Sequence, residues 1–84
     1  MKKITMYTGP FCNYCEAAKR LFVRNNAPFN EIDISKVEGT MDEMIKKANG
    51  RRTIPQIFFD DQHIGGYDEV RELEKENKLQ DLLK

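Results

Sequence analysis

Two cysteines separated by two residues, Cys12 and Cys15, are the side chains of this sequence most able to do chemistry, and the 84 residues contain no other cysteine. A secreted domain of this size usually carries several cysteine pairs, whereas a single C-x-x-C pair is typical of redox chemistry or of half a metal site. A purely structural bridge across so short a loop would remove little entropy from the unfolded chain. Zinc needs about four ligands, and His63, which we expect to be an exposed hairpin residue, is the one histidine. We therefore interpret the pair as a redox dithiol.

The position of the cysteines at the start of a predicted helix gives them different tasks. Cys12 should lie at the helix N-terminus, where free N–H groups and the positive end of the helix dipole stabilise a thiolate. Cys15 should lie one turn further, on the buried face with Ala18, Leu21 and Phe22. We expect Cys12 to attack a disulfide and form the mixed disulfide, and Cys15 to attack Cys12 and release the product.

The elements that would position this pair follow from periodicity and turn residues. β-branched and aromatic residues bounded by Gly and Pro indicate strands, and apolar residues three or four apart indicate helices. The predicted elements are a strand at 4–8, a helix at 13–23, a strand at 29–34, a helix beginning at Thr40, a strand at 54–59, a returning strand at 63–64, a helix beginning at Asp68, and a short helix or a continuation of it at 79–83. This order, β-α-β-α-β-β-α, predicts a single α/β domain spanning residues 1–84.

The order of the elements defines how the strands pair. A β-α-β start requires two parallel strands joined by a right-handed crossover, and the later hairpin adds antiparallel strands. We therefore expect a four-stranded mixed sheet flanked by three or more helices. A C-x-x-C pair beside a β-α-β unit is a signature of the thioredoxin fold, and this sequence meets both conditions.

Two of the predicted helices begin with capping signals. Thr40 is followed three residues later by Glu43, which is the spacing of a capping box. Asp68 is the expected N-cap of the third long helix. Within the helix that follows Thr40, Met41 and Met44 belong to the apolar stripe that should face the core.

Charge and hydropathy exclude several classes of function. Lys and Arg number 14 and Asp and Glu number 14, so the net charge is zero and no excess positive charge is available for a nucleic-acid backbone. No apolar run approaches the roughly 20 residues of a membrane span. The basic start Lys2-Lys3 is not followed by the apolar segment of a signal peptide. We therefore expect a cytoplasmic protein without nucleic-acid or membrane partners. We also expect a monomer.

A proline at the start of a predicted strand points to a binding function. Pro55 has no N–H and would interrupt a central ladder, but beside a site it leaves the backbone groups of Ile54 free for a ligand. A cis Ile54–Pro55 bond would turn those groups outward. On spacing alone, Arg51-Arg52 and Gly65-Gly66 are as compatible with solvated turns as with a binding site.

Three segments together resemble the motifs of a known family. They are Cys12-Asn13-Tyr14-Cys15, Arg52-Thr53-Ile54-Pro55-Gln56-Ile57-Phe58 and His63-Ile64-Gly65-Gly66-Tyr67-Asp68. In this order and at this spacing they are similar to the small bacterial-type dithiol glutaredoxins, over essentially the whole chain. The resemblance implies a thioredoxin fold and a glutathione-dependent thiol–disulfide oxidoreductase that reduces glutathione mixed disulfides and protein disulfides. It also implies glutathione as co-substrate, no required cofactor, and disulfide-bonded or glutathionylated proteins as partners.

The resemblance further assigns a glutathione site. Cys12 would form the mixed disulfide with the glutathione thiol, and the backbone of Ile54, before a cis proline, would pair with the tripeptide. Tyr67 and Asp68 match positions that hold the γ-glutamyl end, and Arg51 matches a position for the glycine carboxylate. No metal-binding residues are assigned, and the residues implied in glutathione binding are Tyr14, Arg51, Thr53, Ile54, Pro55, Gly66, Tyr67 and Asp68.

Two positions depart from the family pattern and keep other functions open. Asn13 stands where the family commonly has proline, and Gly9 where it commonly has lysine. Relatives without that proline sometimes hold a 2Fe–2S cluster between two subunits with the help of glutathione, so an iron–sulfur-binding dimer is one alternative. A thioredoxin-like electron donor recycled by a flavoprotein reductase is another, although the segment 65–68 favours glutathione.

Overall fold

Four strands and four helices make up the fold, in a computed structural model that describes all residues 1–84. The order β-α-β-α-β-β-α confirms the prediction, with the last helix separate from the one before it. None of the helices is both long and apolar enough to cross a bilayer. The elements are β1 (Ile4–Thr8), α1 (Asn13–Arg24), β2 (Phe29–Asp33), α2 (Thr40–Lys47), β3 (Gln56–Phe59), β4 (Gln62–Gly65), α3 (Tyr67–Lys75) and α4 (Leu79–Leu83).

The strands form one mixed sheet in the order β2-β1-β3-β4. β1 and β2 are parallel, with Ile4 opposite Phe29, whereas β1 and β3 are antiparallel, with Ile4 opposite Phe59. β3 and β4 form an antiparallel hairpin. A parallel β-α-β unit followed by an antiparallel hairpin is the mixed sheet expected for the thioredoxin fold.

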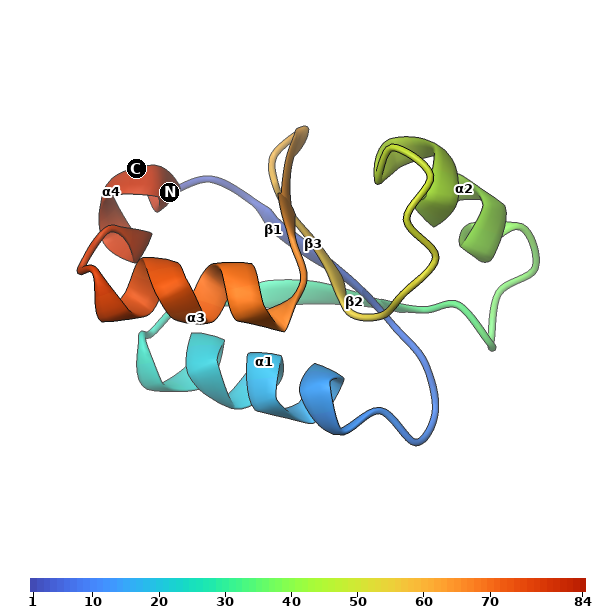
Figure 1. Cartoon of the computed structure of the whole chain (residues 1–84), viewed down its shortest axis with the longest axis horizontal. Coiled ribbons are helices and arrows are strands. Elements are labelled where there is room, and N and C mark those ends of the chain that lie inside the picture. The colour runs from blue at the N-terminus through green and yellow to red at the C-terminus, as the bar shows by residue number, and fades with distance from the viewer.

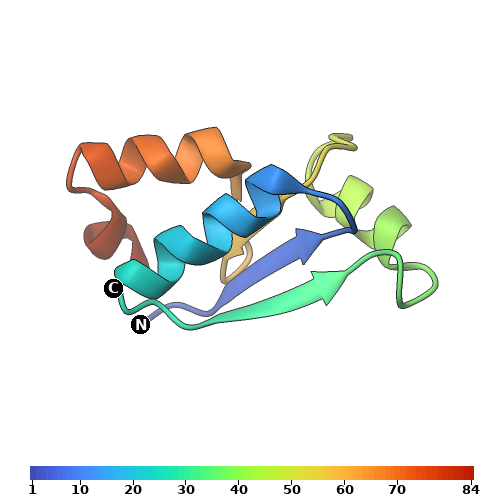
Figure 2. The same ribbon diagram turned by 90° about the horizontal axis from the view of Figure 1, so that it is seen from below.

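Helices cover the two faces of the sheet unequally. α1 and α3 lie side by side on one face, and α2 lies apart from them (Figure 1, Figure 2). Because side chains alternate along a strand, β1 directs Ile4 and Met6 towards α1 and α3, and Tyr7 towards α2. The main core, around α1 and α3, has 11 buried apolar residues. The small core, under α2, consists of Tyr7, Met44, Ala48 and Phe58.

α1 buries the face that the sequence predicted. Its buried residues are Cys15, Ala18, Leu21 and Phe22. Cys12 is the N-cap, with an extended backbone, so its sulfur meets the free N–H groups of the first helical turn. The helix therefore holds one cysteine at its open end and buries the other.

The N-cap predicted for α2 is wrong. Gly39, at φ 86°, is the N-cap, and Thr40 is the first helical residue, so no capping box with Glu43 forms. The Thr40 hydroxyl donates instead to a backbone carbonyl of the preceding turn at 2.6 Å. Met41 is exposed, whereas Met44 is fully buried. The buried stripe of α2 therefore begins one turn later than predicted.

The start of α3 also differs from the prediction. Gly66 is the N-cap, and Asp68 is the second helical residue. The reason is that the carboxylate of Glu69 accepts a hydrogen bond from Gly66 N at 2.9 Å and caps the helix from inside.

The β3–β4 hairpin contains two smaller differences. β3 begins at Gln56, directly after Pro55 and two residues later than predicted. His63 of β4 is partly buried rather than exposed, because its ring packs on Phe58 with the ring centroids 5.0 Å apart.

The two chain ends meet beside α4. Lys2 N donates to Leu83 O at 2.6 Å, and the two termini lie next to each other in both views (Figure 1, Figure 2). Leu79 and Leu83 of α4 are buried in the main core. α4 therefore closes the end of the sheet at which β1 begins, whereas the cysteines follow the other end of β1.

Candidate active site

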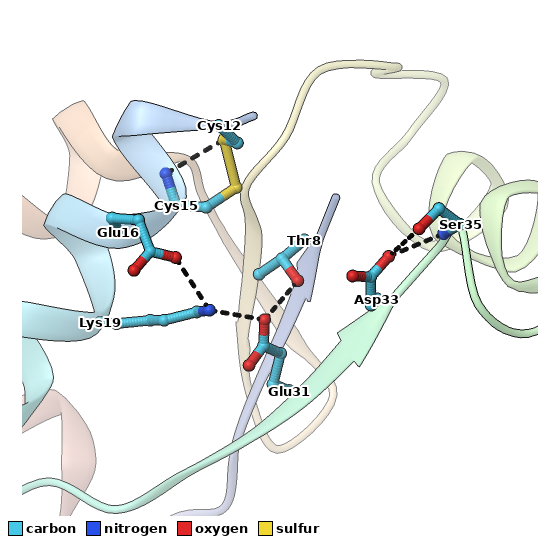
Figure 3. A network of polar contacts seen from close by, with 8 residues as sticks. All are labelled: Thr8, Cys12, Cys15, Glu16, Lys19, Glu31, Asp33 and Ser35. Carbon is cyan, nitrogen blue, oxygen red and sulfur yellow. Dashed lines mark hydrogen bonds and ion pairs between the residues drawn. A yellow bond between two sulfur atoms is a disulfide. The ribbon is translucent and has the colours of Figure 1, made fainter. Parts of the chain in front are cut away.

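Cys12 and Cys15 form a disulfide at the start of α1. Cys15 is 1% exposed, whereas Cys12 is partly accessible. The backbone N–H of Cys15 donates to Cys12 Sγ at 3.1 Å (Figure 3). The asymmetry expected from the sequence is present, since the accessible sulfur is also the one that a helix N–H contacts.

The turn before Cys12 presents an aromatic side chain that the sequence analysis did not single out. Phe11 is fully exposed and adopts a φ of 55°, which is unfavourable for a bulky residue. In the same turn, a Cβ on Gly9 would lie 2.7 Å from Ile54 Cδ1. Gly9, one of the two departures from the family pattern, therefore packs closely against a residue assigned to glutathione binding.

A groove of about 270 Å³ opens beside the cysteines. All eight residues that the resemblance implied in glutathione binding line it, and Glu69 is the ninth. The structure thus brings together residues from α1, α3 and the segment before β3. The lining residues are Tyr14, Arg51, Thr53, Ile54, Pro55, Gly66, Tyr67, Asp68 and Glu69.

The groove has an aromatic wall and a backbone edge. The rings of Tyr14 and Tyr67 stack with centroids 5.9 Å apart and an interplanar angle of 27°, which joins α1 to α3. The Ile54–Pro55 bond is cis, as predicted. Ile54 O lies 3.8 Å from Cys12 Sγ, a distance at which a reduced thiol could donate to it. The backbone edge therefore runs directly past the sulfur expected to react.

Glu69 connects the charged groups of the groove. Arg51 Nη1 donates to Glu69 Oε1 at 2.9 Å, and the same oxygen accepts from Gly66 N. The hydrogen bond from Gly66 N and, after it, the Arg51 guanidinium lower the pKa of Glu69. Gly65, at φ 130°, leaves the room that this carboxylate needs, because a Cβ there would collide with it.

This pairing defines where Arg51 lies. Its guanidinium pairs with Glu69, the neighbour of Asp68 in sequence, and so lies at the start of α3 rather than at a distant end of the groove. Sequence reasoning missed Glu69. Its spacing of three residues after Gly66, which matches a capping box, is the signal that could have identified it.

A polar network ties the start of α1 to the sheet. Lys19 Nζ lies 2.7 Å from Glu31 Oε2 and 3.0 Å from Glu16 Oε2, and Thr8 Oγ1 donates to Glu31 at 2.7 Å (Figure 3). The hydrogen bonds from Lys19 and Thr8 lower the pKa of Glu31, and the bond to Glu31 raises the pKa of Lys19. The network fixes the helix that carries both cysteines against β1 and β2.

Two other features bear on the choice of site. No group of three or more His, Cys, Asp or Glu residues in the chain is arranged to hold a metal ion. A larger surface depression, about 660 Å³, is lined by Tyr7 and Phe58 on the α2 face and contains no cysteine. The smaller groove is the candidate active site because the reactive sulfur lies beside it.

Comparison with known proteins agrees with this geometry. The family model described as glutaredoxin matches residues 4–64. The chain belongs to the glutaredoxin family. Together with the disulfide at Cys12 and Cys15, membership makes this glutaredoxin a thiol–disulfide oxidoreductase.

Individual relatives match along nearly the whole chain. Glutaredoxin 3 of Escherichia coli is 42% identical over 84 residues, with 100% of both chains covered. Glutaredoxin 1 of Rickettsia conorii is 42% identical over 81 residues, covering 95% of this chain and 79% of the relative. The solution structure of glutaredoxin from Brucella melitensis has a TM-score of 0.85 at 46% identity, covering 100% of this chain and 90% of that one. The buckwheat glutaredoxin–glutathione complex has a TM-score of 0.87 at 27% identity, covering 98% and 76%.

Proposed function

We propose that this glutaredoxin uses reduced glutathione to reduce glutathione mixed disulfides and protein disulfides, with Cys12 as nucleophile and Cys15 as resolving thiol. The observation that carries the proposal is the approach of Ile54 O to Cys12 Sγ, at 3.8 Å, along one groove with all the implied glutathione-binding residues. The family uses glutathione as co-substrate, and the buckwheat relative was solved as its glutathione complex.

The forward reaction transfers two electrons from the dithiol to the substrate. The Cys12 thiolate attacks one sulfur of the substrate disulfide, and the other substrate sulfur leaves as a thiolate that takes up a proton. Cys12 is then joined to the substrate in a mixed disulfide. The Cys15 thiolate attacks Cys12 Sγ and expels the second substrate thiol, which leaves the Cys12–Cys15 disulfide present in the structure.

Glutathione restores the dithiol in two exchanges. The first glutathione thiolate attacks Cys12 Sγ, because this sulfur is accessible and that of Cys15 is buried. It releases Cys15 and leaves glutathione bound to Cys12. A second glutathione thiolate attacks the bound glutathione sulfur and departs as oxidised glutathione. The N–H of Cys15, 3.1 Å from Cys12 Sγ, stabilises the Cys12 thiolate that is released.

We assign the tripeptide to the groove with its backbone along Ile54 and its γ-glutamyl ammonium on Asp68. Arg51, the residue implied for the glycine carboxylate, is the basic group available to a ligand carboxylate. Since Arg51 is paired with Glu69, a ligand carboxylate must either share the guanidinium with Glu69 or replace Glu69 as its partner. Arg51→Gln is expected to raise KM for a glutathione mixed disulfide severalfold with little change in kcat.

The deciding experiment measures reduction of a glutathionylated cysteine peptide, coupled through glutathione reductase to NADPH oxidation. The wild type and Cys15→Ser should both turn over, because deglutathionylation needs only Cys12. Cys12→Ser should be inactive. With a protein disulfide as substrate, Cys15→Ser should lose activity, because the mixed disulfide can no longer be resolved from within. Full activity of Cys12→Ser would refute the proposal.

The proposed reaction requires a compartment that keeps glutathione reduced, such as the cytoplasm, and a monomer is sufficient for it. A 2Fe–2S-bridged dimer is the competing function, because Asn13 replaces the usual proline and a solved structure concerned with metal binding of glutaredoxins is 46% identical. Anaerobic reconstitution with iron, sulfide and glutathione separates the two. A brown dimer with visible absorbance would favour the cluster, and a colourless monomer would contradict it.

A further inference from the structure

The segment that carries the backbone edge of the groove has little backbone support of its own. Residues 52–55 lie between α2 and β3, outside any helix or strand. They take part in no backbone–backbone hydrogen bond; before them Arg51 N donates to Ala48 O, and after them Gln56 pairs with Tyr7 in the β1–β3 ladder. Thr53 is also solvent-exposed. A segment with this description is expected to be mobile unless side chains hold it.

One buried side chain supplies that hold. Gln56 is 0% exposed, at the first position of β3. Its Nε2 donates to Thr53 O at 2.9 Å and lies 3.1 Å from Thr53 Oγ1. Burying an amide without partners is costly, so these contacts are needed by Gln56 as much as by Thr53.

The remaining amide atom of Gln56 reaches the hairpin. Its Oε1 lies 2.7 Å from His63 Nε2. Because Thr53 O can only accept a hydrogen bond, the NH₂ group of Gln56 must face Thr53 and its oxygen must face His63. His63 must therefore carry the proton on Nε2 and donate it. The chain of hydrogen bonds runs in one direction, from His63 through Gln56 to Thr53.

His63 is itself held in place. Its ring packs on Phe58, with centroids 5.0 Å apart and an interplanar angle of 33°. Burial and, after it, the positive charge of Arg51 lower the pKa of His63, against an opposing effect of Glu69. The imidazole is neutral near pH 7, and in either charge state its Nε2–H remains a donor.

We propose that His63 and Gln56 are positioning residues for the glutathione site, and that their hydrogen bonds fix Thr53 and Ile54 in the conformation that passes Cys12. The role rests on the proposed function. Neither residue lines the groove, so both act through Thr53. Without them, the ligand would have to order the segment on binding, which lowers affinity but leaves the sulfur chemistry unchanged.

The test compares His63→Phe with His63→Gln. Phenylalanine keeps a ring on Phe58 but has no donor, whereas glutamine keeps an N–H that can reach Gln56. With the glutathionylated peptide as substrate, His63→Phe should raise KM about tenfold, the equivalent of ordering one residue on binding, with kcat within about twofold. NMR order parameters of the backbone N–H groups of residues 52–54 should be lower in the same variant. His63→Gln should restore both properties.

A matched control is Tyr7→Phe, which also removes one side-chain hydrogen bond on the α2 face, the one to Glu43, but keeps the packed ring and every hydrogen bond to Thr53. Its KM and its order parameters at residues 52–54 should equal those of the wild type. The role is overturned if His63→Phe leaves KM and the order parameters unchanged. It is also overturned if His63→Gln is as impaired as His63→Phe, since packing alone would then explain the effect. Absence of wild-type turnover would overturn the proposed function and this role together.

Discussion

The two faces of the sheet differ in how they are held together. The main core gathers 11 buried apolar residues from β1, β3, three helices and the turn before β2, whereas the small core has four. The α2 face depends correspondingly more on polar contacts, of which the hydrogen bond from Tyr7 Oη to Glu43 and the His63–Gln56 pair are partly buried examples.

The difference bears on the active site because the site draws on both faces. The cysteines belong to α1, which the main core anchors, while Thr53 and Ile54 belong to a segment that follows α2. We therefore expect Cys12 to keep its position under mildly denaturing conditions that already loosen the backbone edge of the groove at Thr53 and Ile54. The variants below test this expectation, from the largest effect on stability to the smallest.

Phe22→Ala should cause the largest loss of stability, because Phe22 is fully buried in the main core. The free energy of unfolding is expected to fall by about 3–5 kcal/mol, as for other buried aromatic truncations. Urea denaturation measures it. Val23→Ala, at the exposed neighbouring position, is the control and should change stability by less than about 0.5 kcal/mol. Equal effects of the two variants would contradict the assignment of the main core.

Met44→Ala should lower the free energy of unfolding by less, about 2 kcal/mol, because the small core can close around the resulting cavity more easily. It should nevertheless raise KM for the glutathionylated peptide, since α2 leads into the segment that carries Ile54. Met41→Ala, on the exposed side of the same helix, should change neither quantity. An unchanged KM in Met44→Ala would show that the backbone edge of the groove does not depend on the packing of α2.

Glu74→Gln tests the polar link between α1 and α3. Arg24 and Asn25 donate to the Glu74 carboxylate at 2.6–2.9 Å, and the Arg24 contacts lower its pKa from 4.5 to about 2. Because the folded-state pKa is depressed, this stabilisation is fully present above about pH 5 and is lost as the pH falls towards 2. The variant should lose about 1.5 kcal/mol at pH 7.

The pH dependence provides the control for that variant. Wild-type and Glu74→Gln stabilities, measured by urea denaturation, should converge as the pH is lowered from 5 to 2. Glu76→Gln removes a carboxylate that pairs only with exposed Lys78 and should leave stability nearly unchanged. A constant gap between wild type and Glu74→Gln across this range would contradict the role of the ion pair.

Tyr7→Phe should have the smallest effect, a loss of about 0.5–1 kcal/mol from one hydrogen bond. The ring remains packed against Phe58, and Glu43 keeps Lys47 as a partner. Thermal unfolding is sensitive enough to detect the change. A loss as large as that of Met44→Ala would show that polar rather than apolar contacts dominate the α2 face.

Most of the fold could be predicted because its signals are local. The buried face of α1 follows from the spacing of Cys15, Ala18, Leu21 and Phe22, and the strands follow from short β-branched runs. The residues of the groove were predicted for another reason, namely the resemblance of three segments to one family. The structure adds that these segments, far apart in sequence, line one groove.

The errors arose where a tertiary contact competes with a local one. Glu43 was expected to cap its own helix, but its carboxylate accepts a hydrogen bond from Tyr7, 36 residues earlier. Glu69, rather than Asp68, was found to cap α3 because it also pairs with Arg51. The link from His63 to Gln56 depends on the hairpin register, which the pattern of residues does not define.

Because the two chain ends lie next to each other, the protein can be circularly permuted. Lys2 N and Leu83 O are within hydrogen-bonding distance, so a linker of a few residues would join the termini without crossing the groove. New ends could then be opened in the exposed turn between β2 and α2, around residues 35–38. A circular permutant of this kind should keep its dithiol chemistry. The whole domain should also keep that chemistry when it is inserted into a surface loop of a host protein.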